Sequence, residues 1–114
     1  KVDIEGDEYE ILSDITENSQ KIVSLIIEFH NLKTNLDKIE TFINKNKFLK
    51  LIHIHANNFK DTDANGDPND IELTFVNINK INVSNKKSKK NYPISGLDYK
   101  NFKRKNDIEL RFND

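Results

Sequence analysis

The sequence contains no cysteine, no methionine and no tryptophan among its 114 residues, and only three glycines and two prolines. Without cysteine the chain can form neither a disulfide nor a thiolate metal site, which fits a reducing, cytoplasmic compartment. The three scattered glycines leave no glycine-rich phosphate loop, and the sequence has no nucleophile elbow and no Cys–His pair. Because methionine is absent and the first residues already have the pattern of a strand, we expect the chain to be part of a larger enzyme domain.

Neither sign of charge dominates, since 18 basic residues face 19 acidic ones and the net charge is −1. No overall field therefore attracts nucleic acid or an anionic membrane, and we expect neither as a partner. No apolar run approaches the roughly 20 residues that a membrane span requires. The lysine-rich segment 86–90 has no interleaved aromatic residues, which favours a solvated loop over a base-stacking surface.

The apolar residues fall into short runs that alternate between strand and helix patterns, which predicts an α/β fold. Short β-α-β connections predict right-handed crossovers and a parallel sheet with helices on its faces. The polar segment 57–69 has no helical pattern, so the strand that follows it is expected to run antiparallel. In chain order, the expected elements are a strand ending near Ile4, a short helix after Gly6, a strand at 22–27, a helix at 35–47 and strands at 49–55 and 71–78.

The chain is expected to form one domain, with residues 1–79 supplying the sheet and residues 80–114 a basic loop and a terminal strand. Alternation in Ile108–Phe112 predicts that last strand. In the strand at 49–55, a period of two places Leu49 and Leu51 on the same face as His53 and His55.

Polar side chains collect where the expected strands end. In an open parallel sheet, ligands bind beyond the carboxyl ends of the strands, and an antiparallel last strand would begin at the same edge. All three histidines of the chain belong to this set. The residues are Asp3 and Glu5 after the first strand, Glu28 and His30 after the second, His53, His55, Asn57 and Asn58 in or after the third, and Asp70 and Glu72 at the start of the last.

Two chemistries suit such a group of residues. A histidine or carboxylate could act as a general base toward a hydroxyl, or imidazole and carboxylate could hold a divalent metal. The spacings match no compact metal motif, so no metal is expected. Structural roles remain an alternative for every residue, for example turn formation by Asn57 and Asn58.

The opening Lys1-Val2-Asp3-Ile4-Glu5-Gly6-x-Glu8-x-Glu10-Ile11-Leu12 resembles the strand-four signature of FkbM-type, S-adenosylmethionine-dependent methyltransferases. Later blocks resemble a subgroup of that family in the same order: 25–30, 53–58, 68–75 and 97–101. The resemblance implies a partial Rossmann-like class I methyltransferase sheet, made of strands four to seven with the last strand antiparallel. It also implies that strands one to three, which carry the glycine-rich loop and the acidic residue that bind S-adenosyl-L-methionine, lie outside this chain.

The reaction that the resemblance implies is methyl transfer to a hydroxyl, such as one on a small molecule, a sugar or a glycan. From the positions of the strand ends, Asp3 and Glu5 would lie beside cofactor and acceptor, with His30 or His55 as the base. Four further residues would orient the acceptor, and this chain alone is expected to be inactive. These four are Glu28, Asn57, Asn58 and Glu72.

Two other functions remain open from the sequence. One is a non-enzymatic α/β binding module whose strands happen to end in polar residues. The other is a fragment of a metal-dependent hydrolase. The oligomeric state does not follow from the sequence.

Overall fold

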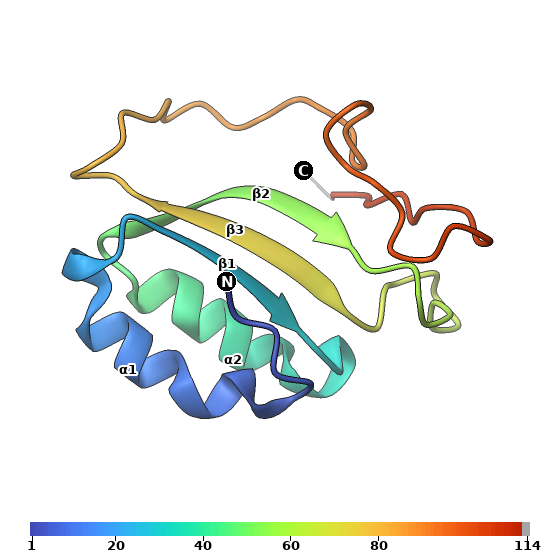
Figure 1. Ribbon diagram of the computed structural model, residues 1–114, viewed down its shortest axis with the longest axis horizontal. Coiled ribbons are helices and arrows are strands. Elements are labelled where there is room, and N and C mark those ends of the chain that lie inside the picture. The colour runs from blue at the N-terminus through green and yellow to red at the C-terminus, as the bar shows by residue number, and fades with distance from the viewer. Residues whose placement is uncertain (113–114) are drawn as a thin grey trace.

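Three strands form an antiparallel sheet in the order β1-β3-β2 in the computed structural model, which describes residues 1–112 (Figure 1). The strands are β1 (Ser24–Phe29), β2 (Leu49–Ala56) and β3 (Ile71–Asn77). Strand β3 lies between the other two and runs antiparallel to both, so β1 and β2 point in the same direction. The carboxyl ends of β1 and β2 therefore lie at the edge of the sheet where β3 begins.

The helical elements cover one face of this sheet (Figure 1). They are the 3₁₀ helix η1 (Asp7–Ile11), α1 (Leu12–Glu17), the 3₁₀ helix η2 (Ser19–Lys21) and α2 (Leu32–Lys45). Helix α2 buries Ile39 and Phe42, which are three residues apart and so share one face. Among residues 1–112, no helix combines the length and the apolar character that crossing a membrane would require.

The core lies between the helices and the sheet. The Phe42 ring of α2 packs edge-on against Phe75 of β3 at 5.5 Å and against Phe29 of β1 at 6.4 Å between ring centroids, an arrangement that aromatic rings favour. Alternate residues of β1 point into this core, as the period of a strand requires. The buried core residues are Leu12, Leu25, Ile27, Phe29, Ile39, Phe42, Leu49, Leu73 and Phe75.

A bulge in β2 corrects the predicted faces of that strand. The register shifts between Leu51 and His53, so that Leu51 pairs with Phe75 while His53 pairs with the adjacent Thr74. The additional residue, Ile52, is 44% exposed. Leu49 and Leu51 therefore face the helices, whereas His53 and His55 face the opposite side.

That opposite side of the sheet is polar and is covered by the irregular segment 80–112 (Figure 1). His53 Nε2 contacts Asp98 Oδ1 at 2.7 Å, and its ring packs against Tyr92 at 5.3 Å between centroids. The α/β fold is confirmed, but two expectations are wrong for residues 1–112. The three strands form an antiparallel sheet and not a parallel one, because β3 lies between β1 and β2. The helices lie on one face of this sheet and not on both. A sheet face that carries charged side chains offers little apolar surface for a helix to bury.

Two expected strands are reduced to single bridges. Val2 pairs in parallel with Ile27, through Val2 N to Ile26 O at 2.8 Å and Glu28 N to Val2 O at 3.0 Å. Within Ile108–Phe112, only Leu110 forms a bridge, to Tyr92. The first chain segment thus runs along the outer edge of β1, and the predicted terminal strand does not form.

Candidate functional site

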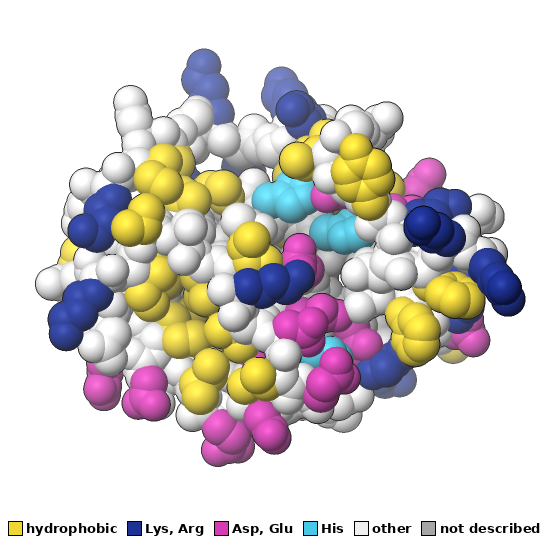
Figure 2. All heavy atoms as spheres, in the orientation of Figure 1, with side chains coloured by type: hydrophobic (Ala, Val, Ile, Leu, Met, Phe, Trp, Pro, Cys, Tyr) yellow, Lys and Arg dark blue, Asp and Glu magenta, His cyan; other side chains and the backbone are white. Residues whose placement is uncertain are grey.

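The site is built around the imidazole of His30, the first residue after β1. The side chain of His30 is 6% exposed, and its Nε2 atom faces three carboxylates. Asp3 Oδ1 and Glu28 Oε1 each lie 3.8 Å from Nε2, and Glu5 Oε2 lies 3.7 Å away. Figure 2 shows acidic side chains gathered around a histidine on this face of the molecule. The first segment of the chain and the end of β1 therefore meet in one cluster.

Glu8 fixes the orientation of His30 from the buried side. Its Oε1 atom accepts a hydrogen bond from the backbone N–H of His30 at 2.7 Å and lies 3.1 Å from Nδ1 of the same residue. Its Oε2 atom accepts the N–H of Gly6 at 2.9 Å. Burial alone would raise the pKa of Glu8, but these donors outweigh it and lower the pKa below its ordinary value. An ionised Glu8 favours a proton on Nδ1 of His30, and the other ring nitrogen, Nε2, faces the three carboxylates.

Three residues with positive φ shape the cluster. Glu5 has a φ of 57° and the adjacent Gly6 a φ of 112°, so the chain turns sharply where the Glu5 carboxylate meets His30. Asn31, directly after His30, has a φ of 54°. Glycine adopts such angles freely and asparagine tolerates them, but for a glutamate the left-handed region is strained.

A row of polar residues crosses the sheet beside the cluster. Glu28 of β1 lies opposite Glu72 of β3, and Glu72 lies opposite His55 of β2. Asn57 Nδ2 donates a hydrogen bond to Glu28 Oε1 at 2.5 Å. Burial, and after it the nearby carboxylates, raises the pKa of Glu28 despite that bond. Lys1 partly compensates the charge of the row through an ion pair of 2.8 Å with Glu72.

The structure therefore brings together most of the residues that the sequence suggested. Asp3, Glu5, Glu28 and His30 meet directly, Asn57 is hydrogen-bonded to the cluster, and Glu72 and His55 continue the row across the sheet.

The two histidines of β2 have partners in the C-terminal segment instead. His55 Nε2 lies 3.4 Å from Asp107 Oδ1, and His53 is paired with Asp98. Of the two histidines considered as a base, His30 is therefore the one surrounded by the leading acids.

Asn58 has a structural role in the described part of the chain. Asn58 is buried, and both ends of its amide are bonded to the C-terminal segment. Its Nδ2 donates to Phe102 O at 3.0 Å, and its Oδ1 accepts the N–H of Phe102 at 2.8 Å. Asn58 is thus a structural link between the end of β2 and a later loop.

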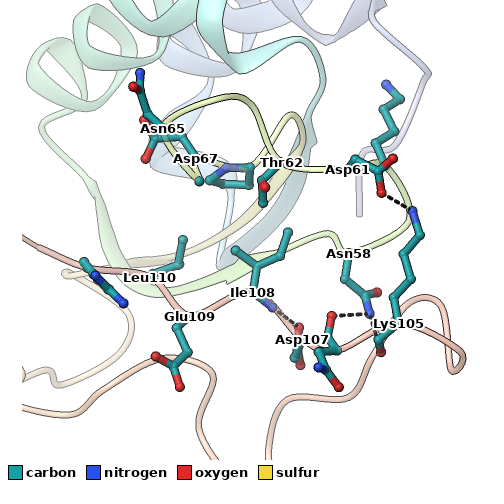
Figure 3. Close-up of a pocket in the computed structure, with 15 residues that line it drawn as sticks. Asn58, Asp61, Thr62, Asn65, Asp67, Lys105, Asp107, Ile108, Glu109 and Leu110 are labelled. Carbon is teal, nitrogen blue, oxygen red and sulfur yellow. Dashed lines mark hydrogen bonds and ion pairs between the residues drawn. The ribbon is translucent and has the colours of Figure 1, made fainter.

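A cleft of about 520 Å³ opens nearby, between the loop that follows β2 and the C-terminal segment (Figure 3). Asn58 and Asp107 line it, and Lys105 crosses one end to reach Asp61 at 2.7 Å. The cluster around His30 does not line this cleft. The acids and the histidine form an open site at the end of β1, separate from this hollow.

Sequence reasoning missed the roles of Glu8 and Asp70. Asp70 is buried, accepts the N–H of Asn31 at 3.1 Å and pairs with Lys60. A signal for Glu8 was present, because it lies three residues after Glu5 on the first turn of η1, beside a glycine that turns the chain. Its complete burial could not be foreseen, since a glutamate in a first helical turn is usually a solvated cap.

The arrangement permits two kinds of chemistry. A buried imidazole with one proton fixed on Nδ1 can accept a proton at Nε2. Asp3, Glu5 and His30 also offer donor atoms that all lie within 4.8 Å of one another, which is the type of set that holds a divalent metal. The sequence raised this second possibility but did not favour it, because the three residues belong to no compact metal motif.

Comparison with known proteins adds nothing to the geometry: no protein-family model, no curated protein and no solved structure matches this chain.

Proposed function

We propose that this chain is the C-terminal half of an S-adenosylmethionine-dependent O-methyltransferase domain and that the cluster around His30 forms the acceptor side of its active site. The single observation that carries the proposal is the meeting of Asp3, Glu5 and Glu28 within 3.8 Å of His30 Nε2. The acceptor would be a hydroxyl on a small molecule or glycan. A chain without cysteine is compatible with action in the cytoplasm.

The topology supports this proposal. The resemblance to FkbM-type enzymes implies successive parallel strands followed by an antiparallel last strand. In agreement, Val2 pairs in parallel with β1, β1 and β2 point in the same direction, and β3 runs antiparallel to both. Polar residues at the carboxyl ends of β1 and β2 then lie where an open α/β sheet binds ligands.

The residues present fit the cofactor only in part. Asp3, with a side chain that is 39% exposed, is the residue of this chain that we propose contacts the cofactor. Gly6, Gly66 and Gly96 each have a positive φ in a separate turn, and no two of them form a phosphate-type loop. The chain by itself therefore does not provide a complete cofactor site, and in the proposed enzyme the cofactor would supply the methyl group.

The chain's own residues would position and activate the acceptor. His30 Nε2 would accept the proton of the hydroxyl, because Glu8 holds the other ring proton on Nδ1. A general base of this kind contributes roughly 10²–10⁴-fold to rate. Glu28, whose pKa is raised by burial, and Asn57 would hydrogen-bond the acceptor from β1 and from the residue after β2.

The test is binding of S-adenosylmethionine and transfer of a labelled methyl group, measured on the protein extended by its natural upstream coding sequence. We expect calorimetry to detect cofactor binding that Asp3→Ala weakens, and we expect transfer to polyhydroxyl acceptors. Asp63→Ala, in a loop remote from His30, is the matched control and should retain both. Absence of cofactor binding in the folded, extended protein would refute the proposal and favour the binding module.

A further inference from the structure

We propose that Asp3, Glu5 and His30 form a binding site for one divalent transition-metal cation, such as Zn²⁺ or Mn²⁺. The donors are one imidazole nitrogen and two carboxylate oxygens, which come from the first segment of the chain and from the end of β1. This site does not depend on the proposed methyl transfer, and a cation bound at Nε2 would prevent that atom from acting as the base.

The position of His30 Nε2 is the first argument. Only 6% of the His30 side chain is exposed, and its Nε2 atom forms no hydrogen bond within residues 1–112. Its carboxylate neighbours lie at 3.7 and 3.8 Å, which is beyond hydrogen-bonding distance. The largely buried side chain therefore presents a nitrogen without a bonding partner in this part of the chain to the carboxylates, and a cation between the donors would give it one.

The second argument is the outer partner of the ring. Metal-bound histidines usually donate their other N–H to a carboxylate, which fixes the tautomer and makes the ligand more basic. Glu8 has this relation to His30 Nδ1, at 3.1 Å, and is itself held by the backbone N–H groups of His30 and Gly6. The ring is therefore oriented before any ligand arrives.

The third argument is charge. Asp3, Glu5 and Glu28 all face the same ring nitrogen, and within residues 1–112 none of the three pairs with a lysine or arginine. The cation in the adjacent row, Lys1, is bonded to Glu72 at 2.8 Å. A divalent cation would balance the negative charge that this cluster leaves uncompensated.

The distances are compatible with shared coordination. Two donors that each lie about 2.1 Å from one metal can be at most about 4.2 Å apart. The separations of Nε2 from Asp3 Oδ1 and from Glu5 Oε2 are 3.8 and 3.7 Å. Glu5 is largely exposed, so its carboxylate can move closer to Asp3 without disturbing the core. Mixed nitrogen and oxygen donors favour a transition metal over Ca²⁺ or Mg²⁺.

The test is calorimetric titration of the chelator-treated 114-residue chain with ZnCl₂, MnCl₂ and MgCl₂. We expect one Zn²⁺ per chain, weaker Mn²⁺ in the order that divalent metals follow, and little heat from Mg²⁺. Asp3→Asn and Glu5→Gln should each weaken Zn²⁺ binding at least tenfold. Both side chains are accessible enough for these variants to fold, and His30→Gln is added only if it retains the circular dichroism of the parent.

The matched control is Asp63→Asn. The spacing Asp61-x-Asp63-x-Asn65-Gly66 resembles the start of a calcium loop, but Asp63 Oδ1 already accepts the N–H groups of Asn65 and Asp67 at 2.8 and 3.0 Å. Zinc binding should be unchanged in this variant. In ¹⁵N spectra of the imidazole, Zn²⁺ should shift the Nε2 signal of His30 and leave Nδ1 protonated.

Three results would overturn the site: no saturable Zn²⁺ binding below millimolar concentration, binding that Asp63→Asn removes, or binding that survives both Asp3→Asn and Glu5→Gln. Loss of cofactor binding in the extended protein would leave the metal site standing. Loss of metal binding alone would leave His30 Nε2 free to act as the base.

Discussion

At the scale of single residues, Glu5 has a backbone conformation that is unfavourable for folding, although its carboxylate belongs to the cluster around His30. Glu5 occupies the left-handed region with a φ of 57°, and its side chain is 86% exposed. A residue with a Cβ atom pays about 1–2 kcal/mol there, whereas glycine pays almost nothing. By backbone conformation alone, glycine would be the more favourable residue at this position.

We therefore predict that Glu5→Gly is more stable than Glu5→Ala by about 1 kcal/mol, the reverse of the usual order of these two residues. Both variants lose the carboxylate, so both should lose the proposed metal binding. Urea denaturation of the two variants and the parent chain measures the difference. An alanine variant as stable as the glycine variant would mean that the turn relaxes when the glutamate is removed.

Residue-level prediction from the sequence succeeded in bringing together the side chains at the ends of the strands. Asp3, Glu28 and His30 were expected together because strand periodicity and sheet topology bring such positions to one edge. The hydrogen bonds of Glu8 and Asn58 did not follow from the sequence, because the partners of both residues lie far away in the chain. Glu8 reaches His30 and Asn58 reaches Phe102, contacts of 22 and 44 residues in sequence separation that no local pattern encodes.

At the scale of elements, two buried asparagines connect irregular segments to the sheet. Asn58 binds the loop around Phe102, and Asn77, at the end of β3, donates from Nδ2 to Ser19 O at 3.1 Å and to Ile22 O at 2.9 Å. Each satisfies backbone groups that would otherwise be buried without a partner, which costs about 1–3 kcal/mol per group. Asn58 is bonded to the C-terminal segment, whereas Asn77 is bonded to the segment between α1 and β1.

Asn58→Ala should loosen the C-terminal segment without unfolding the core. Hydrogen exchange should rise at the amide of Phe102 and around residues 99–107, while β1 and β3 stay protected. In Asn77→Ala the same side chain is removed at a position next to the core, and the substitution should lower the free energy of unfolding of the whole chain. Equal, global loss of protection in both variants would show that the C-terminal segment and the sheet unfold as one unit.

The pair between His53 and Asp98 makes the docking of the C-terminal segment dependent on pH. Burial raises the pKa of Asp98, but the N–H of Ile94, at 2.6 Å, and the His53 side chain outweigh it and lower the pKa below its ordinary value. The folded chain therefore binds a proton at Asp98 less readily than the unfolded chain does. The stabilisation is present at neutral pH and is lost as the pH falls below about 4, the ordinary value for aspartate.

Asp98→Asn should accordingly destabilise the chain at pH 7 by about 1.5–3 kcal/mol, as expected for hydrogen bonds to a charged group. The difference from the parent chain should shrink as the pH is lowered from 5 to 3. Urea midpoints of both proteins at several pH values measure it. A difference that stays constant over this range would show that ionised Asp98 contributes nothing.

At the scale of the whole molecule, the core is complete before the C-terminal segment begins. The buried core cluster lies between Leu12 and Phe75, and the apolar residues packed against it reach from Val2 only to Ile71. The segment 80–112 contributes one buried aromatic residue, Tyr92, on the opposite side of the sheet.

A chain that ends after Asn79 should therefore retain its helices and strands and unfold cooperatively, with a lower urea midpoint than the full chain. Circular dichroism at 222 nm during denaturation checks this. The expected loss comes from uncovering His53 and His55 and from exposing Asn58. A truncated chain without a cooperative transition would place the C-terminal segment within the folding unit instead.

The sequence predicted the α/β class and nearly every strand and helix of residues 1–79, because these follow from local periodicity. It did not predict that β3 would lie between β1 and β2 or that the helices would share one face. Strand order depends on which surfaces remain to be buried once all elements are present. Glu28, Glu72 and His55 lie on one face of the sheet. The helices therefore pack against the other face, which is apolar.

The extra residue in β2, Ile52, reverses which face of the sheet the odd-numbered residues of that strand point to. Up to Leu51, the odd-numbered residues face the hydrophobic core, and from His53 onward the odd-numbered residues face the opposite, polar side of the sheet. Because of this bulge, residues spaced two apart along β2 lie on different faces: Leu49 and Leu51 face the core, and His53 and His55 face the opposite side. An alignment of this strand with a regular strand must therefore open a gap at Ile52, or it will equate residues of the core face with residues of the polar face.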